Sequence, residues 1–219
     1  PILLVIGIML LILATSMLVP AGLDGLLGNP DWEVFLASAF VTAFTGAAIT
    51  LTTRSGSGDI DLRSAFLLTT VSWIVMPAFA ALPFVFSELN LDYTDAFFEA
   101  MSGLTTTGST VITNLETAPP GLLIWRALLQ WIGGIGIIVT AVAILPLLQI
   151  GGMQLFNIES SETSEKVLPR AAQIAGTVGI IYVCLTGLCA LAIWVAGMPP
   201  FDAIAHAMTT IATGGFSTS

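Results

Sequence analysis

Two short stretches rich in threonine and glycine combine the oxygen ligands and the backbone freedom that binding a dehydrated cation requires. Glycine adopts unusual dihedral angles that turn successive carbonyl oxygens toward one axis, and a threonine hydroxyl supplies a further oxygen. Cation filters replace the hydration shell of the ion with rings of such oxygens. We therefore expect the two stretches, residues 105–110 and 213–217, to line an ion path.

The two stretches belong to a longer similarity at an offset of 107 residues. Six of the 14 positions from Asp95 to Gly108 are identical to those 107 residues later. A single Thr-Thr-Thr-Gly segment is typical of a glycine-capped helix end. Two copies in one register favour a repeated functional loop over that interpretation.

A short apolar segment precedes each stretch, at residues 94–104 and 200–211. A ten-residue helix covers about 15 Å, half of the hydrocarbon core of a bilayer. Irregular backbone at membrane depth survives only where protein or a water-filled cavity covers it. Because the C-terminal end of a helix carries partial negative charge, such half-helices favour a cation at the loops that follow them. The pattern predicts two re-entrant pore loops.

The overall composition agrees with a membrane location. Of the 219 residues, 56% are hydrophobic and 9% are charged, against about 25% charged residues in soluble domains. An ordinary soluble enzyme and a disordered chain are thereby excluded, and the net charge of −9 argues against nucleic acid as a partner. Apolar runs predict an all-α integral membrane protein with five spans: residues 1–23, 34–53, 64–87, 127–158 (with a helix start near Pro120) and 171–201.

The predicted repeat unit is a membrane helix, a half-helix, a filter loop and a second membrane helix. Two spans return the chain to its starting side, so the repeats are parallel rather than inverted. We divide the chain into an accessory helix pair (1–60), a first pore module (61–158), a cytoplasmic loop (159–170) and an incomplete second pore module (171–219). We expect truncation after the second filter, and no conducting pore from two loops alone.

Charged side chains give an orientation. Basic residues of two loops on one side mark it as cytoplasmic: Arg54, Arg63, Lys166 and Arg170. The opposite side holds nine acidic residues, which either concentrate cations or form a solvated rim.

Three polar or small-residue features of the apolar segments have structural interpretations. Arg126 is the one basic residue on the acidic side, and we expect it to contact Glu99. We expect His206 to be a hydrogen-bonded packing residue rather than a ligand. The glycines of the segment 133–136 favour close helix packing over a hinge.

Several motifs in combination resemble the Trk/Ktr/HKT potassium transporter superfamily. Residues 97–108 (FFEAMSGLTTTG) resemble its first pore loop, and residues 125–126 (WR) and 130–138 (QWIGGIGII) continue the likeness. Residues 143–146 (AILP) and 151–155 (GGMQL) are similar to the TrkH subfamily, and residues 211–218 (IATGGFST) resemble its second pore loop.

The resemblance implies a K+-channel-like fold of four pore modules in one chain, after an extra helix pair. It implies potassium uptake across the bacterial inner membrane through a gated pore, with K+ as the transported ion and no cofactor. The implied assembly is a lipid-embedded homodimer with a cytosolic nucleotide-binding regulatory subunit of the TrkA type. Gly108 and Gly215 match the key filter glycines, and the resemblance implies that Thr106, Thr107, Thr213 and Gly214 line the ion path beside them. Glycine at the first of these positions implies a preference for potassium over sodium.

Two other functions remain open: a sodium- or proton-coupled cation symporter, since broken helices also serve that class, and a non-conducting sensor. An enzyme is not expected, because the sequence has no H-E-x-x-H or G-x-S-x-G motif and a lone histidine forms neither a triad nor a metal cluster.

The filter assignment predicts that Gly108→Ser in the full-length protein lowers the permeability to potassium relative to sodium. A side chain at this position disturbs the backbone angles that glycine allows. Relative permeability measured from reversal potentials checks this. An unchanged ratio would contradict the assignment.

Overall fold

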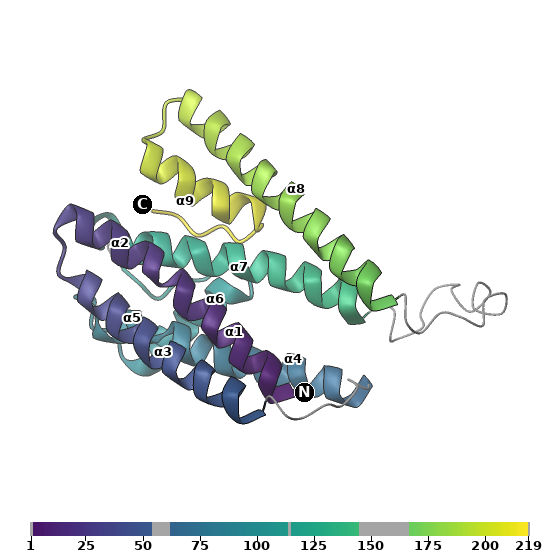
Figure 1. Ribbon diagram of the computed structural model, residues 1–219. Helices are drawn as coiled ribbons and strands as arrows, with labels where there is room; N and C mark the ends of the chain where they lie inside the picture. Colours follow the sequence, from purple (N-terminus) through teal and green to yellow (C-terminus); the bar gives the residue numbers. More distant parts are fainter. Residues whose placement is uncertain (1, 54–61, 114, 145–166, 219) are drawn as a thin grey trace.

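The computed structural model of the chain describes residues 2–53, 62–113, 115–144 and 167–218. The elements of these segments are helices (Figure 1). In chain order they are α1 (Ile2–Ser16), α2 (Leu18–Leu27), α3 (Asp31–Thr53), α4 (Leu62–Ala80), α5 (Leu82–Phe86), α6 (Tyr93–Leu104), the 3-10 helix η1 (Leu115–Thr117), α7 (Pro120–Ile144), α8 (Val167–Val195) and α9 (Pro200–Ile211).

Within the described segments, five helical stretches are long and apolar enough to cross a membrane: Ile2–Leu27, Asp31–Thr53, Arg63–Phe86, Pro120–Ile138 and Gly176–Val195. The predicted all-α membrane fold is thus confirmed at this level. The first stretch is interrupted at Met17 and the third at Ala81. The second interruption precedes Pro83, which has no N–H to donate to the preceding turn.

The ends of two predicted spans differ from the structure. Helix α7 begins at Pro120 as expected, but residues 145–158 lie outside the described residues. Helix α8 begins at Val167, so the last residues of the predicted loop 159–170 are helical. It ends at Val195 rather than near residue 201, because Gly197 has a φ of 106° and two prolines follow, which favour extended backbone before them.

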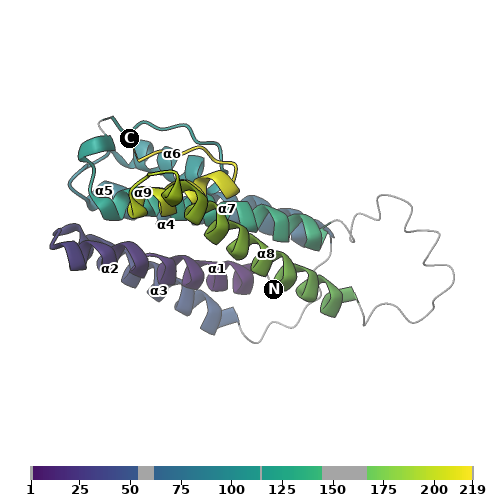
Figure 2. The ribbon, with the colours of Figure 1, turned by 90° about the horizontal axis from the view of Figure 1, so that it is seen from above.

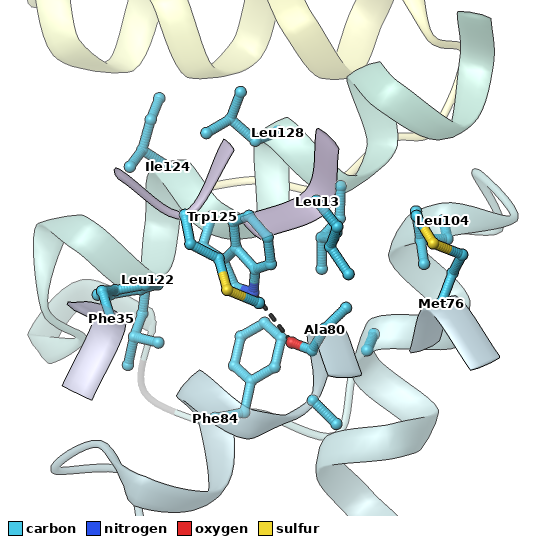
Figure 3. Packing of buried hydrophobic residues seen from close by; sticks show 14 of the residues in the cluster. Leu13, Phe35, Met76, Ala80, Phe84, Leu104, Leu122, Ile124, Trp125 and Leu128 are labelled. Carbon is cyan, nitrogen blue, oxygen red and sulfur yellow. Dashed lines mark hydrogen bonds between the residues drawn. The ribbon is translucent and has the colours of Figure 1, made fainter. Parts of the chain in front are cut away.

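In Figure 1, helix α7 lies between two groups of helices, and Figure 2 shows α1 to α3 set apart from it on one side. On one side are α1 to α3, and on the other are α8 and α9. The core around α7 centres on Trp125, which is fully buried. Its indole Nε1 donates to the carbonyl oxygen of Ala80 at 3.1 Å (Figure 3), and its ring meets the edge of Phe35. This contact fixes α7 against α4 and α3.

Small residues bring α1 and α3 together. A Cβ built on Gly46 would lie 2.9 Å from the carbonyl oxygen of Gly7, and one on Gly7 would meet the backbone of Gly46 at the same distance. Close backbone approach at glycine pairs is typical of membrane helices. Helices α1 and α3 therefore pack directly against each other through their backbones.

A buried carboxylate joins this pair to α7. Asp24 on α2 is fully buried, and its Oδ1 accepts the N–H of Gly121 at 2.8 Å. The first N–H groups of a helix have no partner within the helix, and an acidic side chain there also interacts favourably with the helix dipole. Asp24 therefore caps α7 from another helix.

We predict that Asp24→Ala lowers the free energy of unfolding by about 1 kcal/mol, the usual cost of losing a cap. Asp24→Asn is the matched control, because it keeps an oxygen acceptor for Gly121. Thermal unfolding in detergent, followed by tryptophan fluorescence, compares the variants. An Asp24→Ala protein as stable as the wild type would contradict the capping role.

Candidate functional site

The two short helices expected at residues 94–104 and 200–211 are present as α6 and α9, and both end in the same backbone pattern. Thr106 and Thr213 each have a φ of 57°. The N–H of Thr107 donates to Ser102 and that of Gly214 to Thr209, both at 2.9 Å. This is a Schellman ending with threonine in the left-handed position. A non-glycine residue there costs about 1–3 kcal/mol.

Glycine takes the second left-handed position of each loop. Gly108 and Gly215 have φ values of 80° and 79°. If the Thr-Gly segments were simply glycine-capped helix ends, glycine would occupy the left-handed position that ends each helix. Here threonine closes both helices, so the glycines serve the loops beyond the helix ends.

The structure brings the two loops into contact at one point. A Cβ on Gly108 would overlap the carbonyl oxygen of Gly214, so the backbones touch there. Gly214 is buried, whereas Thr107, Thr213 and Gly215 are exposed. The hydroxyl of Thr107 remains in its own loop, 2.7 Å from that of Thr105.

A buried ion pair lies behind the first loop. Arg126 Nε on α7 donates to Glu99 Oε1 on α6 at 2.8 Å, and both side chains are at most 2% exposed. The Glu99 carboxylate also accepts the hydroxyl of Thr110 and the N–H of Val111 at 2.9–3.0 Å. The expected contact is confirmed, and it attaches the segment after Gly108 to both helices.

The same arginine reaches the second loop. Arg126 Nη1 donates to the carbonyl oxygen of Ser217 at 2.8 Å, and its guanidinium lies 4.1 Å from the ring centroid of Phe216. Cation–π contacts of this kind are stronger when desolvated. The ion pair therefore holds the backbone beyond both loops, with Glu99 bonded to the first and Arg126 to the second.

His206 occupies the position that matches Glu99 at the 107-residue offset. Its Nδ1 donates to the carbonyl oxygen of Asp202 at 2.9 Å, and its Nε2 lies 3.3 Å from the hydroxyl of Ser217. The pairs Glu99–Thr110 and His206–Ser217 thus make matching helix-to-loop contacts. The expectation of a hydrogen-bonded packing histidine is confirmed.

Two glycines of α7 allow the short helices to approach closely. A Cβ on Gly133 would overlap the carbonyl of Leu104 at the end of α6, and one on Gly134 would lie 3.2 Å from Ala212 at the end of α9. Packing therefore explains both residues. Gly136 has nothing within 4 Å of a built Cβ, so packing does not explain it.

Two buried polar residues had no role assigned from the sequence. Ser102 donates to the carbonyl oxygen of Ser109 at 2.6 Å, and Gln130 Oε1 accepts the N–H of Phe216 at 3.1 Å. Gln130 follows Arg126 by one helical turn in an otherwise apolar segment. That spacing places both residues on one face of the helix. It is the sequence pattern from which a role for Gln130 beside Arg126 could have been predicted.

Acidic residues on the side opposite the predicted cytoplasmic loops divide into two groups. Asp24, Asp31 and Glu99 are buried and accept hydrogen bonds from other elements. The exposed members include Glu33, Glu88, Asp92, Asp95 and Glu116. Only the exposed group remains available to attract cations.

Comparison with known proteins gives consistent matches. The model of the TrkH family, described as a cation transport protein, matches residues 32–219. The Trk system potassium uptake protein TrkH of Salmonella typhimurium is 44% identical over 217 residues, which cover 98% of this chain and 45% of that protein. The Trk system potassium uptake protein TrkI of Halomonas elongata is 44% identical over 222 residues, covering 100% of this chain and 44% of that protein.

The fold is similar as well. The crystal structure of the potassium transporter TrkH from Vibrio parahaemolyticus superposes with a TM-score of 0.88 at 42% identity, covering 100% of this chain and 44% of that chain. The chain thus spans about half the length of the curated relatives it matches.

We predict that Glu99→Gln lowers the free energy of unfolding by about 3–5 kcal/mol, because it leaves the buried charge of Arg126 uncompensated. Glu33→Gln, at an exposed carboxylate of α3, is the control and should leave stability unchanged. The midpoints of unfolding in detergent compare the stability of the two variants. Equal midpoints for the two variants would show that the ion pair does not stabilise the site.

Proposed function

This chain belongs to the TrkH family of cation transport proteins, and on that basis we propose that it supplies two filter loops of a gated potassium uptake pore. By family and by its spans it is a multi-pass protein of the bacterial inner membrane. The relatives are named as uptake proteins, and we propose transport rather than catalysis, with K+ as the transported ion and no cofactor.

The matched loop geometry carries this proposal. Two helices of 12 residues each end in left-handed threonines and are followed by left-handed glycines at the same spacing. Backbone contact between Gly108 and Gly214 supports a shared axis for the loops. We propose that Thr106, Thr107, Gly108, Thr213, Gly214 and Gly215 line the ion path, with backbone oxygens as ligands.

Electrostatics favour backbone oxygens over side-chain charge as the source of cation binding. The carboxylate of Glu99 is compensated by Arg126 and accepts from two further donors, the Thr110 hydroxyl and the Val111 N–H, so it offers little to a passing ion. The C-terminal ends of α6 and α9 carry partial negative charge at the loops. This arrangement suits a monovalent cation that must bind and leave again.

We further propose the organisation of the whole protein. Residues 1–60 form the accessory pair, 61–158 the first pore module, 159–170 the cytoplasmic connection and 171–219 the beginning of the second pore module. Two further modules would complete a ring of four loops. We propose a homodimer in lipid with a cytosolic nucleotide-binding subunit that gates each pore.

The direct test measures rubidium and potassium entry into bacterial cells that lack their own potassium uptake. The full-length protein is expressed with its cytosolic partner, and we expect robust entry. No entry from well-expressed protein would contradict potassium uptake and favour the sensor alternative.

Current recordings separate a pore from a symporter. We expect a current that reverses at the potassium equilibrium potential and does not respond to sodium or proton gradients. A reversal potential that follows either of those gradients would contradict the channel-like mechanism and support coupled symport.

A further inference from the structure

Gln130 lies behind both loops, within the membrane-spanning part of α7. Its side chain is fully buried, although a primary amide is costly to bury without partners. It lies one turn beyond Arg126, on the helix face that holds the two loops. The buried amide must therefore find its hydrogen-bond partners within the protein rather than in water.

One end of the amide fixes the second loop. Gln130 Oε1 accepts the N–H of Phe216, the residue after Gly215, at 3.1 Å. Because a backbone N–H is only a donor, this bond determines which end of the amide is oxygen and which is nitrogen. A Cβ on Gly214 would overlap this amide. The backbone of the second loop thus lies directly on Gln130.

The other end of the amide faces the first loop. Gln130 Nε2 lies 3.7 Å from a Cβ built on Gly108, at the point where Gly108 meets the carbonyl of Gly214. Nε2 is buried and has no hydrogen-bond partner in the described part of the chain. Its N–H groups are therefore donors held next to the junction of the loops.

We infer that Gln130 is a positioning residue that sets the spacing between the two filter loops and thereby determines ion selectivity. The inference rests on the proposed function. A filter distinguishes potassium from sodium by the positions and field of its oxygens. A support that bonds to the second loop and lies beside the first controls the distance between them. Arg126 bonds to the segment beyond the second loop, whereas Gln130 lies against Gly214 and beside Gly108.

Gln130→Leu tests this in the full-length protein. The variant replaces the amide with an apolar side chain of similar size and leaves the Phe216 N–H without an acceptor. The loss of such a buried hydrogen bond corresponds to about a tenfold change in an equilibrium constant. We expect the permeability ratio of potassium to sodium to fall about tenfold, while current remains. Reversal potentials in planar bilayers give this ratio independently of the amount of protein.

Trp125→Phe is the matched control. It also removes one buried hydrogen bond from α7, but that bond goes to Ala80 on α4 rather than to a loop. We expect it to lower stability without changing the permeability ratio.

If Gln130→Leu yields no current, Gln130→Glu replaces it, since Glu keeps the acceptor for Phe216 and places a charge beside the loops. A changed ratio in that variant supports the inference.

A selective wild type with an unchanged ratio in the Gln130 variant would overturn this inference and leave potassium uptake intact. An equal shift in Trp125→Phe would also overturn it, because the effect would then follow from any loosening of α7. A wild type without potassium current would overturn the proposed function itself, and this inference with it.

Discussion

The charges of Glu99 and Arg126 lie in the centre of the site, and moving such charges out of water costs several kcal/mol each. The ion pair and its hydrogen bonds offset that cost, and in the described part of the chain only Nη2 of the Arg126 guanidinium is left without a partner. The required partners come from α6, from the segment after Gly108 and from the segment after Gly215. A demand for satisfied charge in an apolar interior therefore determines where both loops lie.

Helix α7 meets this demand with one face. Arg126, Gln130 and the Gly133–Gly134 pair follow one another at about one helical turn, so they lie on the side toward α6 and α9. Long polar side chains hold the loop backbones, and glycines let the ends of the short helices approach. Asp24 in turn caps the beginning of α7. Through α7, helices α1 to α3 and the two loops share a single support.

Sequence patterns predicted the features that depend on local composition. Apolar runs predicted the membrane-length helices, two shorter apolar segments predicted the short helices α6 and α9, and the 107-residue offset aligned the loops that follow them. Because Arg126 is the one basic residue on the acidic side, its ion pair with Glu99 could be predicted. Contacts between distant segments were missed: nothing local shows that Asp24 meets Gly121, 97 residues later, or that Gln130 accepts from Phe216. The end of α8 was placed late because hydrophobicity alone ignored Gly197.

The central claim is that the loops at Gly108 and Gly215, held by α7, face one ion path. Anomalous diffraction from crystals of the full-length protein grown with rubidium tests it directly. The account predicts anomalous density bounded by the backbone oxygens of residues 106–108 and 213–215. Rubidium bound only at other places, with nothing between these loops, would contradict it.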